Sequence, residues 1–267
     1  HGFGDARVFA ETWFPAARHI EVQCIGTPDG VLAVGDRDCS LQRRRQKIVE
    51  IAPAPGLPDG LRADLWRAAE RLLDSMHYLS LATVEFLVSG DDWVLLEVNP
   101  RIQVEHTVTE AVTGLDLVAC QIALGLGEDL AEYGVSEDRS WEPAGAAIEV
   151  RVAAETIGGD GAVHPVTGTI DRFDLPSGPG VRVDTWVRGG TRVGALYDTV
   201  IAKIIVHGPD LTAAHRRSGA ALAELSCTGL ETSQSFLRAV LEQADLGAVH
   251  TTWVDENIEI GRASCRE

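Results

Sequence analysis

Polar and apolar side chains alternate from residue 18 to residue 25, with the polar positions at 19, 21 and 23. Such alternation is typical of a strand that has one buried face. The sequence Thr27-Pro-Asp-Gly30 predicts a turn after it, and residues 31–34 then form the returning strand.

A different periodicity follows the prolines at positions 53, 55 and 58. Asp59 is a candidate N-cap for a helix whose apolar residues recur three or four positions apart. This spacing predicts one packed face made of Leu61, Leu65, Ala68, Leu72 and Met76.

Two further apolar runs, 82–88 and 93–99, predict a hairpin that carries acids. We expect Glu85 to face Glu97 and Thr83 to face Asn99, because a shift of one residue would turn the two acids to opposite faces. That pairing predicts a connection of odd length, for example a three-residue loop at 90–92.

The remaining pattern mixes helices and strands. Helices are expected at 109–113 and 116–126, broken at Gly114, and a polar stretch at 128–145 predicts a domain boundary. Beyond the boundary we expect strands at 147–154, 168–174, 181–185 and 201–207, and helices at 211–225 and 232–241. The fold class is therefore α+β, with domains at 1–140 and 145–258.

Composition narrows the function. The 267 residues are 45% hydrophobic, enough for a core, and the formal net charge of −17 argues against a nucleic-acid or anionic-membrane partner. Five cysteines without C-x-x-C spacing suggest free thiols in a reducing compartment. Without an apolar run of about eighteen residues or a signal peptide, we expect a cytoplasmic protein.

The most informative chemistry lies between residues 95 and 106, where an apolar run ends in Glu97, Asn99, Arg101, Glu105 and His106. An unpaired buried carboxylate is costly, so acids that emerge from a buried strand beside a cation suggest a site for metal-bound phosphate.

Several long motifs, in one order, resemble biotin carboxylase, the ATP-grasp component of biotin-dependent carboxylases. They are Arg18-His-Ile-Glu-Val-Gln23, Arg37-Asp-Cys-Ser-Leu-Gln-Arg-Arg44, Gln46-Lys47, Glu97-Val-Asn-Pro-Arg-Ile-Gln-Val-Glu-His106, Ile148-Glu-Val-Arg151, Gly168-Thr-Ile170 and Tyr197-Asp-Thr-Val-Ile-Ala-Lys203. The resemblance covers residues 3–258 and implies the C-terminal portion of an ATP-grasp domain followed by a biotin carboxylase C-terminal domain.

By this resemblance, the protein joins bicarbonate to ATP as carboxyphosphate and then carboxylates biotin held on a carrier domain. Glu85, Glu97 and Asn99 would bind Mg²⁺ or Mn²⁺, since carboxylates are the hard oxygen ligands that such ions need. Glu105 would be the general base that deprotonates bicarbonate.

The resemblance also implies a bicarbonate pocket. Arg101 offers a planar fork for it, Gln103 and the backbone amide of Val104 complete it, and Lys47 offsets developing negative charge. Arg151 would stabilise the biotin enolate from the second domain.

Nucleotide contacts are implied for Glu11, His19 and Gln42, beside Glu85 and Glu97. Two positions depart from the family: Arg45 stands where histidine is frequent, and Thr12 replaces a lysine. These departures weaken the assignment of nucleotide contacts to the two side chains.

The resemblance leaves three matters open. The alternatives are another ATP-grasp ligase, such as one that forms carbamoyl phosphate, and a non-catalytic ATP-grasp scaffold. Partners would be a biotin carrier and a carboxyltransferase, with a possible homodimer, and the motif at 46–55 slightly favours an acyl-CoA acceptor.

Both ends of the sequence suggest a fragment. The chain starts at His1, the family's earlier segments would precede that residue, and residues 259–267 resemble a non-native tail. We therefore expect the chain alone to bind ATP poorly and to turn nothing over.

Overall fold

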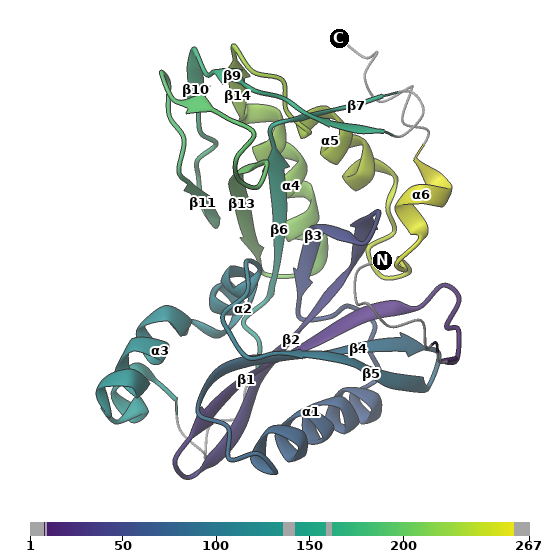
Figure 1. The fold of residues 1–267 in the computed structure, drawn as a ribbon, viewed down its shortest axis with the longest axis vertical. Helices are drawn as coiled ribbons and strands as arrows, with labels where there is room; N and C mark the ends of the chain where they lie inside the picture. Colours follow the sequence, from purple (N-terminus) through teal and green to yellow (C-terminus); the bar gives the residue numbers. More distant parts are fainter. Residues whose placement is uncertain (1–7, 9, 136–141, 159–161, 259–267) are drawn as a thin grey trace.

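One antiparallel sheet of eight strands runs through the computed structural model, which describes residues 8, 10–135, 142–158 and 162–258 (Figure 1). The strand order is β11-β13-β6-β3-β2-β1-β4-β5, with every neighbouring pair antiparallel. The strands are β1 (Arg18–Thr27), β2 (Gly30–Arg43), β3 (Gln46–Ala52), β4 (Ser80–Ser89), β5 (Asp92–Asn99), β6 (Ala146–Ala153), β11 (Val181–Thr185) and β13 (Val200–Gly208).

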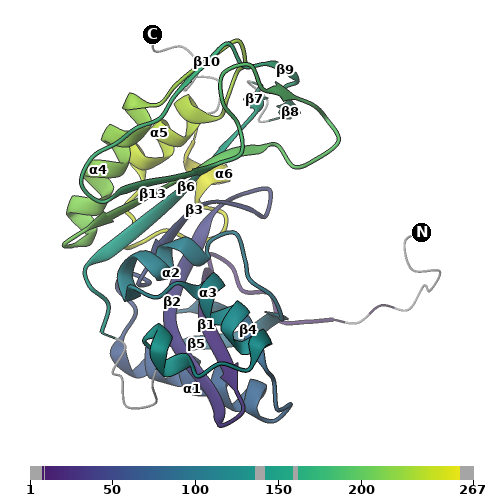
Figure 2. The same ribbon diagram turned by 90° about the vertical axis from the view of Figure 1, so that its left-hand side faces the viewer.

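Helices cover both faces of this sheet. In the part formed by β1, β2, β4 and β5, helix α1 lies on one face and α2 and α3 on the other, while α4 and α5 pack beside β6 and β13 (Figure 2). The helices are α1 (Asp59–Asp74), α2 (His106–Thr113), α3 (Leu117–Leu126), α4 (Leu211–Glu224), α5 (Gln234–Gln243) and α6 (Trp253–Asn257), with a 3₁₀ turn η1 (Leu130–Tyr133). Short strand pairs complete the fold: β7 (Glu155–Ile157) with β8 (Val163–Pro165), β9 (Gly168–Thr169) with β12 (Arg192–Val193), and β10 (Arg172–Asp174) with β14 (Ser226–Thr228).

The alternation predicted for the first strand separates two chemistries. Ile20 and Val22 on β1 pack with α1 in one apolar cluster. Successive strand residues point to opposite faces, so Glu21 lies on the other face together with its cross-strand partner Glu85. The face opposite α1 is therefore the one that can hold polar chemistry.

The hairpin of β4 and β5 confirms that Glu85 faces Glu97, but a β-bulge produces this register. Phe86 pairs with Leu95, whereas the next residue back along β4, Glu85, pairs with Glu97, so Leu96 is an extra residue. Without the bulge, Glu85 would pair with Leu96, and the two acids would point to opposite faces.

The predicted three-residue loop is wrong. Ser89 pairs with Asp92, which leaves a two-residue turn at 90–91, and Gly90 at φ 62° gives that turn the backbone freedom it needs. The bulge compensates for the even turn length, so that Thr83 still pairs with Asn99.

Helix α1 also differs from its prediction. Its N-cap is Pro58 rather than Asp59, and it ends at Asp74, which leaves Met76 exposed. The buried stripe is Leu61, Leu65, Ala69 and Leu73, because residues four apart line the face turned towards the sheet.

Among the strands, 168–174 is interrupted and forms the separate β9 and β10. The pattern did not reveal β3, whose residues 48–52 are all buried. A central strand that is covered on both faces shows no alternation, so period two is absent from its sequence.

The sheet continues across the predicted domain boundary. Strand β3 pairs with β6, with Val49 opposite Val150 and Ile51 opposite Ile148. The two-domain division stays a prediction; residues 136–141 of the boundary and the tail at 259–267 lie outside the described residues. In the described part of the chain no single helix is long and apolar enough to cross a membrane, and α2 with α3 reaches that length only as a pair bent by 97°.

The neighbours Leu72 and Leu73 allow a test of the α1 face. Leu73 is fully buried, whereas Leu72 only borders the same cluster. We expect Leu73→Ala to lower the free energy of unfolding by about 2–5 kcal/mol, because it leaves a cavity. The matched variant Leu72→Ala should cost roughly 1 kcal/mol. Urea unfolding of both variants measures the difference, and equal losses would contradict the placement of the buried face.

Candidate active site

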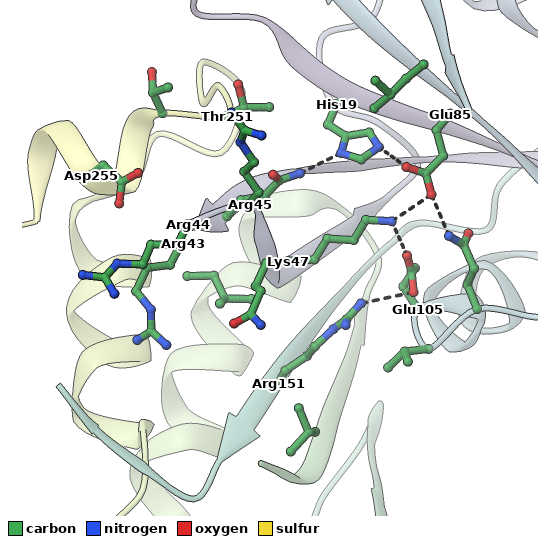
Figure 3. A pocket seen from close by; sticks show the side chains of 18 of the residues that line it. His19, Arg43, Arg44, Arg45, Lys47, Glu85, Glu105, Arg151, Thr251 and Asp255 are labelled. Atoms are coloured by element: carbon green, nitrogen blue, oxygen red, sulfur yellow. Dashed lines mark hydrogen bonds and ion pairs between the residues drawn. The ribbon is translucent and has the colours of Figure 1, made fainter. Parts of the chain in front are cut away.

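A groove of about 810 Å³ opens where β1, β4 and β5 meet the β2–β3 turn, β6 and the segments that carry α5 and α6. Figure 3 shows Lys47, Glu85, Glu105 and Arg151 pointing towards one another on one side of it. The groove therefore combines residues from the first strand of the sheet with residues near the end of the chain.

Lys47, on β3, binds three carboxylates. Its Nζ donates to Glu21 Oε1, to Glu105 Oε1 at 2.7 Å and to Glu85 Oε1 at 3.2 Å. Burial opposes the positive charge, but Cys39 and these three carboxylates together raise the pKa of Lys47 well above its usual value. The side chain is an ammonium ion that holds three segments together.

Glu85 has more hydrogen-bond donors around it than the other acids of the groove. Its Oε1 also accepts from Gln103 Nε2 at 2.6 Å and from Asn99 Nδ2 at 2.9 Å, and its Oε2 lies 2.6 Å from His19 Nε2. Burial alone would raise the pKa of Glu85, but His19, Lys47 and Gln103 together lower it to about 2. Glu85 is therefore ionised.

His19 connects Glu85 to Gln42. Gln42 Nε2 lies 2.6 Å from His19 Nδ1 and also donates to the carbonyl of Cys39 at 2.9 Å, which fixes the orientation of the amide. Since an amide nitrogen only donates, His19 Nδ1 must accept and Nε2 must carry the proton. In this arrangement His19 Nε2 donates to Glu85.

Glu105 lies between two cations. Besides Lys47, it accepts a hydrogen bond from Arg151 Nη2 at 3.1 Å, and its side chain is only 3% exposed. Arg151 belongs to β6, so the predicted second domain contributes directly to the groove. The two cations fix the position of the Glu105 carboxyl group in the groove through charge-assisted hydrogen bonds.

Glu85, Glu97 and Asn99 fit a divalent cation by their donor set. The two acids face each other across β4 and β5, and Asn99 Nδ2 donates to both, at 2.9 Å each. Two carboxylates and an amide offer the hard oxygen atoms that Mg²⁺ and Mn²⁺ prefer. Glu97 is exposed to the groove, so an ion could reach it from solvent.

A second acid cluster needs no metal ion. His19, Glu21 and Glu85 have ligand atoms within 4.8 Å of one another. However, Arg37 and Lys47 already neutralise Glu21, with Arg37 Nε donating to Glu21 Oε2 at 3.1 Å.

The other predicted residues take different positions. Arg101 is exposed and lines the groove, with one guanidinium nitrogen 3.4 Å from Asn99 Oδ1. Val104 lines it too, while its carbonyl accepts from Lys203 Nζ at 2.6 Å. Gln103 is buried, and its amide nitrogen donates to Glu85. Glu11 is exposed and is not among the groove residues, although Thr12 and Trp13 are.

Two buried residues that connect the parts of the site, Glu21 and Arg37, were not predicted from the sequence. Arg37 is completely buried and donates to five side chains, Glu21, Gln23, Thr83, Gln103 and Thr109. The alternation of β1 contained the signal for Glu21, because this residue shares a face with His19. Arg37 lies on the far part of β2, where no returning strand was predicted.

The turn between β2 and β3 brings further positive charge to the groove. Arg43 pairs with Gln46, so Arg44 and Arg45 form a two-residue turn with φ 48° and 66°. Positive φ at both positions is typical of a type I′ turn, where glycine and asparagine are usual and arginine is strained. Figure 3 shows Arg43–Arg45 on the same side of the groove as Thr251 and Asp255.

Two known protein families match successive parts of the sequence. Residues 1–133 match the family described as carbamoyl-phosphate synthase L chain, ATP binding domain. Residues 149–256 match the biotin carboxylase C-terminal domain.

Individual relatives cover most of this chain. The biotin-dependent acyl-coenzyme A carboxylase alpha3 subunit of Mycobacterium leprae is 41% identical over 261 residues, which are 95% of this chain and 42% of that protein. The solved structure of a single-chain, multi-domain long-chain acyl-CoA carboxylase is 48% identical with a TM-score of 0.88, and the match covers 96% of this chain and 27% of that one. The biotin carboxylase domain of a single-chain bacterial carboxylase is 40% identical with a TM-score of 0.88 and 96% and 60% coverage. The chain spans less than two thirds of each relative.

The lowered pKa of Glu85 predicts how stability depends on pH. Its folded value of about 2 lies below the usual 4.5, so the unfolded state binds more protons in between. The stabilisation is present above pH 4.5 and is lost as the pH falls towards 2.

Urea unfolding at a series of acidic pH values checks this prediction. Glu85→Gln should flatten the loss of unfolding free energy towards low pH, whereas Glu97→Gln, its exposed cross-strand partner, should keep the wild-type slope. A Glu85→Gln slope equal to that of the wild type would contradict the assignment.

Proposed function

The chain belongs to the biotin carboxylase family, and we propose that its groove is the part of the active site in which bicarbonate is activated and biotin is carboxylated. The carrying observation is the direct contact of Glu105 with both Lys47 and Arg151. It supports the proposal, because the candidate base Glu105 contacts both Lys47, the cation expected to face bicarbonate, and Arg151, the cation expected to face biotin.

Bicarbonate must lose a proton and be held near the transferring phosphate. Glu105, as a buried carboxylate, accepts that proton, and Arg101 offers two parallel N–H groups to the carbonate oxygens from the groove edge. Lys47 offsets the negative charge that develops during transfer. Because Lys47 also holds Glu105 and Glu85, small movements of one group are felt by the others.

Biotin then needs support for a negative charge on its ureido oxygen. Arg151 reaches the groove from β6 and spends one N–H on Glu105, so part of its guanidinium can serve that oxygen. We assign Arg151 the role of stabilising the biotin enolate. Carboxybiotin, still attached to the carrier domain, then leaves the groove.

In this proposal, ATP lies along the side of the groove that is formed by His19, Gln42 and the turn at Arg44 and Arg45. Glu85, Glu97 and Asn99 would hold the Mg²⁺ or Mn²⁺ that neutralises the phosphate oxygens. The apolar side chains of Leu87 and Leu96 line the same groove and offer packing for a flat base.

The wider setting follows from the relatives. We propose a biotin carrier and a carboxyltransferase as partners, with an acyl-CoA as the acceptor that the transferase selects. The described cysteines Cys24, Cys39, Cys120 and Cys227 are free, which suits a cytoplasmic enzyme. Net charge of −17 speaks against a nucleic-acid partner. A homodimer stays a prediction of the resemblance.

Another ATP-grasp ligase is the second candidate, because the family matched by residues 1–133 is described by carbamoyl-phosphate synthase. The match of residues 149–256 and the contribution of Arg151 from that region favour the carboxylase. A non-catalytic scaffold is disfavoured, since Lys47, Glu85 and Glu105 are all kept and interlocked.

The first test is ADP release by a full-length carboxylase that includes this chain, with Mg-ATP and bicarbonate. We expect release to require bicarbonate and to rise strongly when free biotin is added. Release that ignores biotin would indicate another ligase, and bound ATP without any release would favour the scaffold.

The second test replaces the candidate base. Glu105→Gln keeps the size of the side chain but cannot take a proton, so we expect biotin-dependent turnover to fall by at least about 100-fold. ATP binding, measured by calorimetry, should persist. The control is Glu110→Gln on α2, a half-buried acid that binds Arg182 away from the groove. Turnover retained by Glu105→Gln would remove it from the role of base.

A further inference from the structure

Two buried glutamates lie behind Arg151 and have no part in the chemistry described so far. Glu50 on β3 and Glu149 on β6 are directly opposite each other in the sheet, and both are 0% exposed. Residues opposite each other in antiparallel strands have Cβ atoms about 5 Å apart, and two like charges in that position repel. Their burial therefore requires an explanation.

The groups that face the pair come from every neighbouring element. They are Arg151 on β6, Lys47 on β3, Cys39 on β2, Lys203 on β13, Thr107 on α2 and Glu105 just before α2. Arg151 Nη2 is 2.6 Å from Glu50 Oε1, a charge contact without hydrogen-bond alignment. The contact of Glu149 with a cation is longer, with Lys203 Nζ 3.8 Å from its Oε2, and the hydroxyl of Thr107 donates a hydrogen bond to the same oxygen.

The pair has too few donors. Among the described residues, neither oxygen of Glu50 and only one oxygen of Glu149 has a hydrogen-bond partner. A buried carboxylate oxygen without a donor costs free energy, and a proton on one acid supplies a donor. Burial raises the pKa of both Glu50 and Glu149 more than the neighbouring cations lower it; the charge of Glu149 adds to the rise at Glu50, and the charge of Glu105 adds to the rise at both.

Charge balance in the buried layer agrees with a retained proton. Apart from His19, five buried carboxylates stand against four cations in the described site. The carboxylates are Glu21, Glu50, Glu85, Glu105 and Glu149, and the cations are Arg37, Lys47, Arg151 and Lys203. One proton on the Glu50–Glu149 pair removes the excess negative charge.

The pair acts on the groove through Arg151. The same nitrogen, Arg151 Nη2, contacts Glu50 on one side and Glu105 on the other. Glu50 thus limits where the guanidinium can lie, and the residual charge of the pair sets how strongly the guanidinium is drawn away from the groove.

We propose that Glu50 and Glu149 form a pair that holds one proton, and that Glu50 is a positioning residue that keeps Arg151 aimed at the anionic oxygen of biotin. This inference rests on the proposed function for its catalytic consequence, though the proton itself does not. When the pair loses its proton to solvent at alkaline pH, a second negative charge appears behind Arg151. The support that Arg151 gives to an anion in the groove then weakens.

Kinetics in the full-length carboxylase test the positioning role. Glu50→Gln removes the charge that holds Arg151, so we expect biotin-dependent turnover to fall by about tenfold or more. ADP release without biotin should change little, because that reaction does not use Arg151. Glu50→Gln that turns over with biotin as the wild type does would overturn the positioning role, and so would an equal loss in both reactions.

The pH profile separates this role from a merely structural one. Glu149→Gln imitates the protonated partner and cannot release a proton, so the alkaline decline of biotin-dependent turnover should move to higher pH. The control Glu110→Gln should keep the wild-type profile. An unchanged alkaline limb in Glu149→Gln would contradict the shared proton.

Infrared spectroscopy of the chain detects the proton without any turnover. In a pH series from about 5 to about 9, we expect a buried carboxylic acid band that is still present well above the usual titration range of glutamate. The band should fade towards the alkaline end of the series. The band should be missing from the Glu50→Gln, Glu149→Gln double variant. A folded wild-type chain without such a band would sink the proposal, whereas a band in an enzyme that ignores biotin would refute only the proposed function.

Discussion

Compensation of buried charge is the constraint on which this structure depends. One face of the sheet carries acids and bases that solvent hardly reaches, and each is tolerated only because a neighbour neutralises it. Lys47 shows the principle, since it serves Glu21, Glu85 and Glu105 at once. Removing one member of such a pair leaves an unpaired charge, at a cost of about 3–5 kcal/mol. Stability and site geometry therefore depend on the same contacts.

The sheet can hold this layer because its two faces have different chemistry. On β1 and β4 the residues that face α1 are apolar, whereas the other face carries Glu21 and Glu85 near the groove and the apolar Ile25 and Leu81 only where it meets α3. The division would fail at β5 without Leu96, since the two-residue turn alone gives the wrong register. The bulge resets the pairing between the turn and the acids, so Glu97 joins Glu85 on the polar face. A single extra residue thus decides whether two carboxylates can share a cation.

The sequence predicted these elements to different degrees, for physical reasons. Alternation identified β1 and its polar face because one side of that strand meets an apolar helix and the other meets polar groups. It could not identify β3, which is buried on both faces, nor the bulge, which leaves no mark in periodicity. Glu85 and Glu105 were expected from motif resemblance, whereas Arg37 and the Glu50–Glu149 pair emerge only when distant strands are paired. Short-range patterns carry no information about which buried charges will meet.

The pairing of β6 with β13 explains why residues beyond position 145 belong to the groove at all. Arg151 and Lys203 are directly opposite each other on these strands. Arg151 contacts Glu105, and Lys203 donates to the carbonyl of Val104, the residue just before it. The neighbouring strands β6 and β13 thus contact two consecutive residues, Val104 and Glu105, in the loop that carries the candidate base. Because β6 also pairs with β3, the strand of Lys47, the position of Glu105 relative to Lys47 is fixed through a continuous sheet rather than through a flexible domain contact.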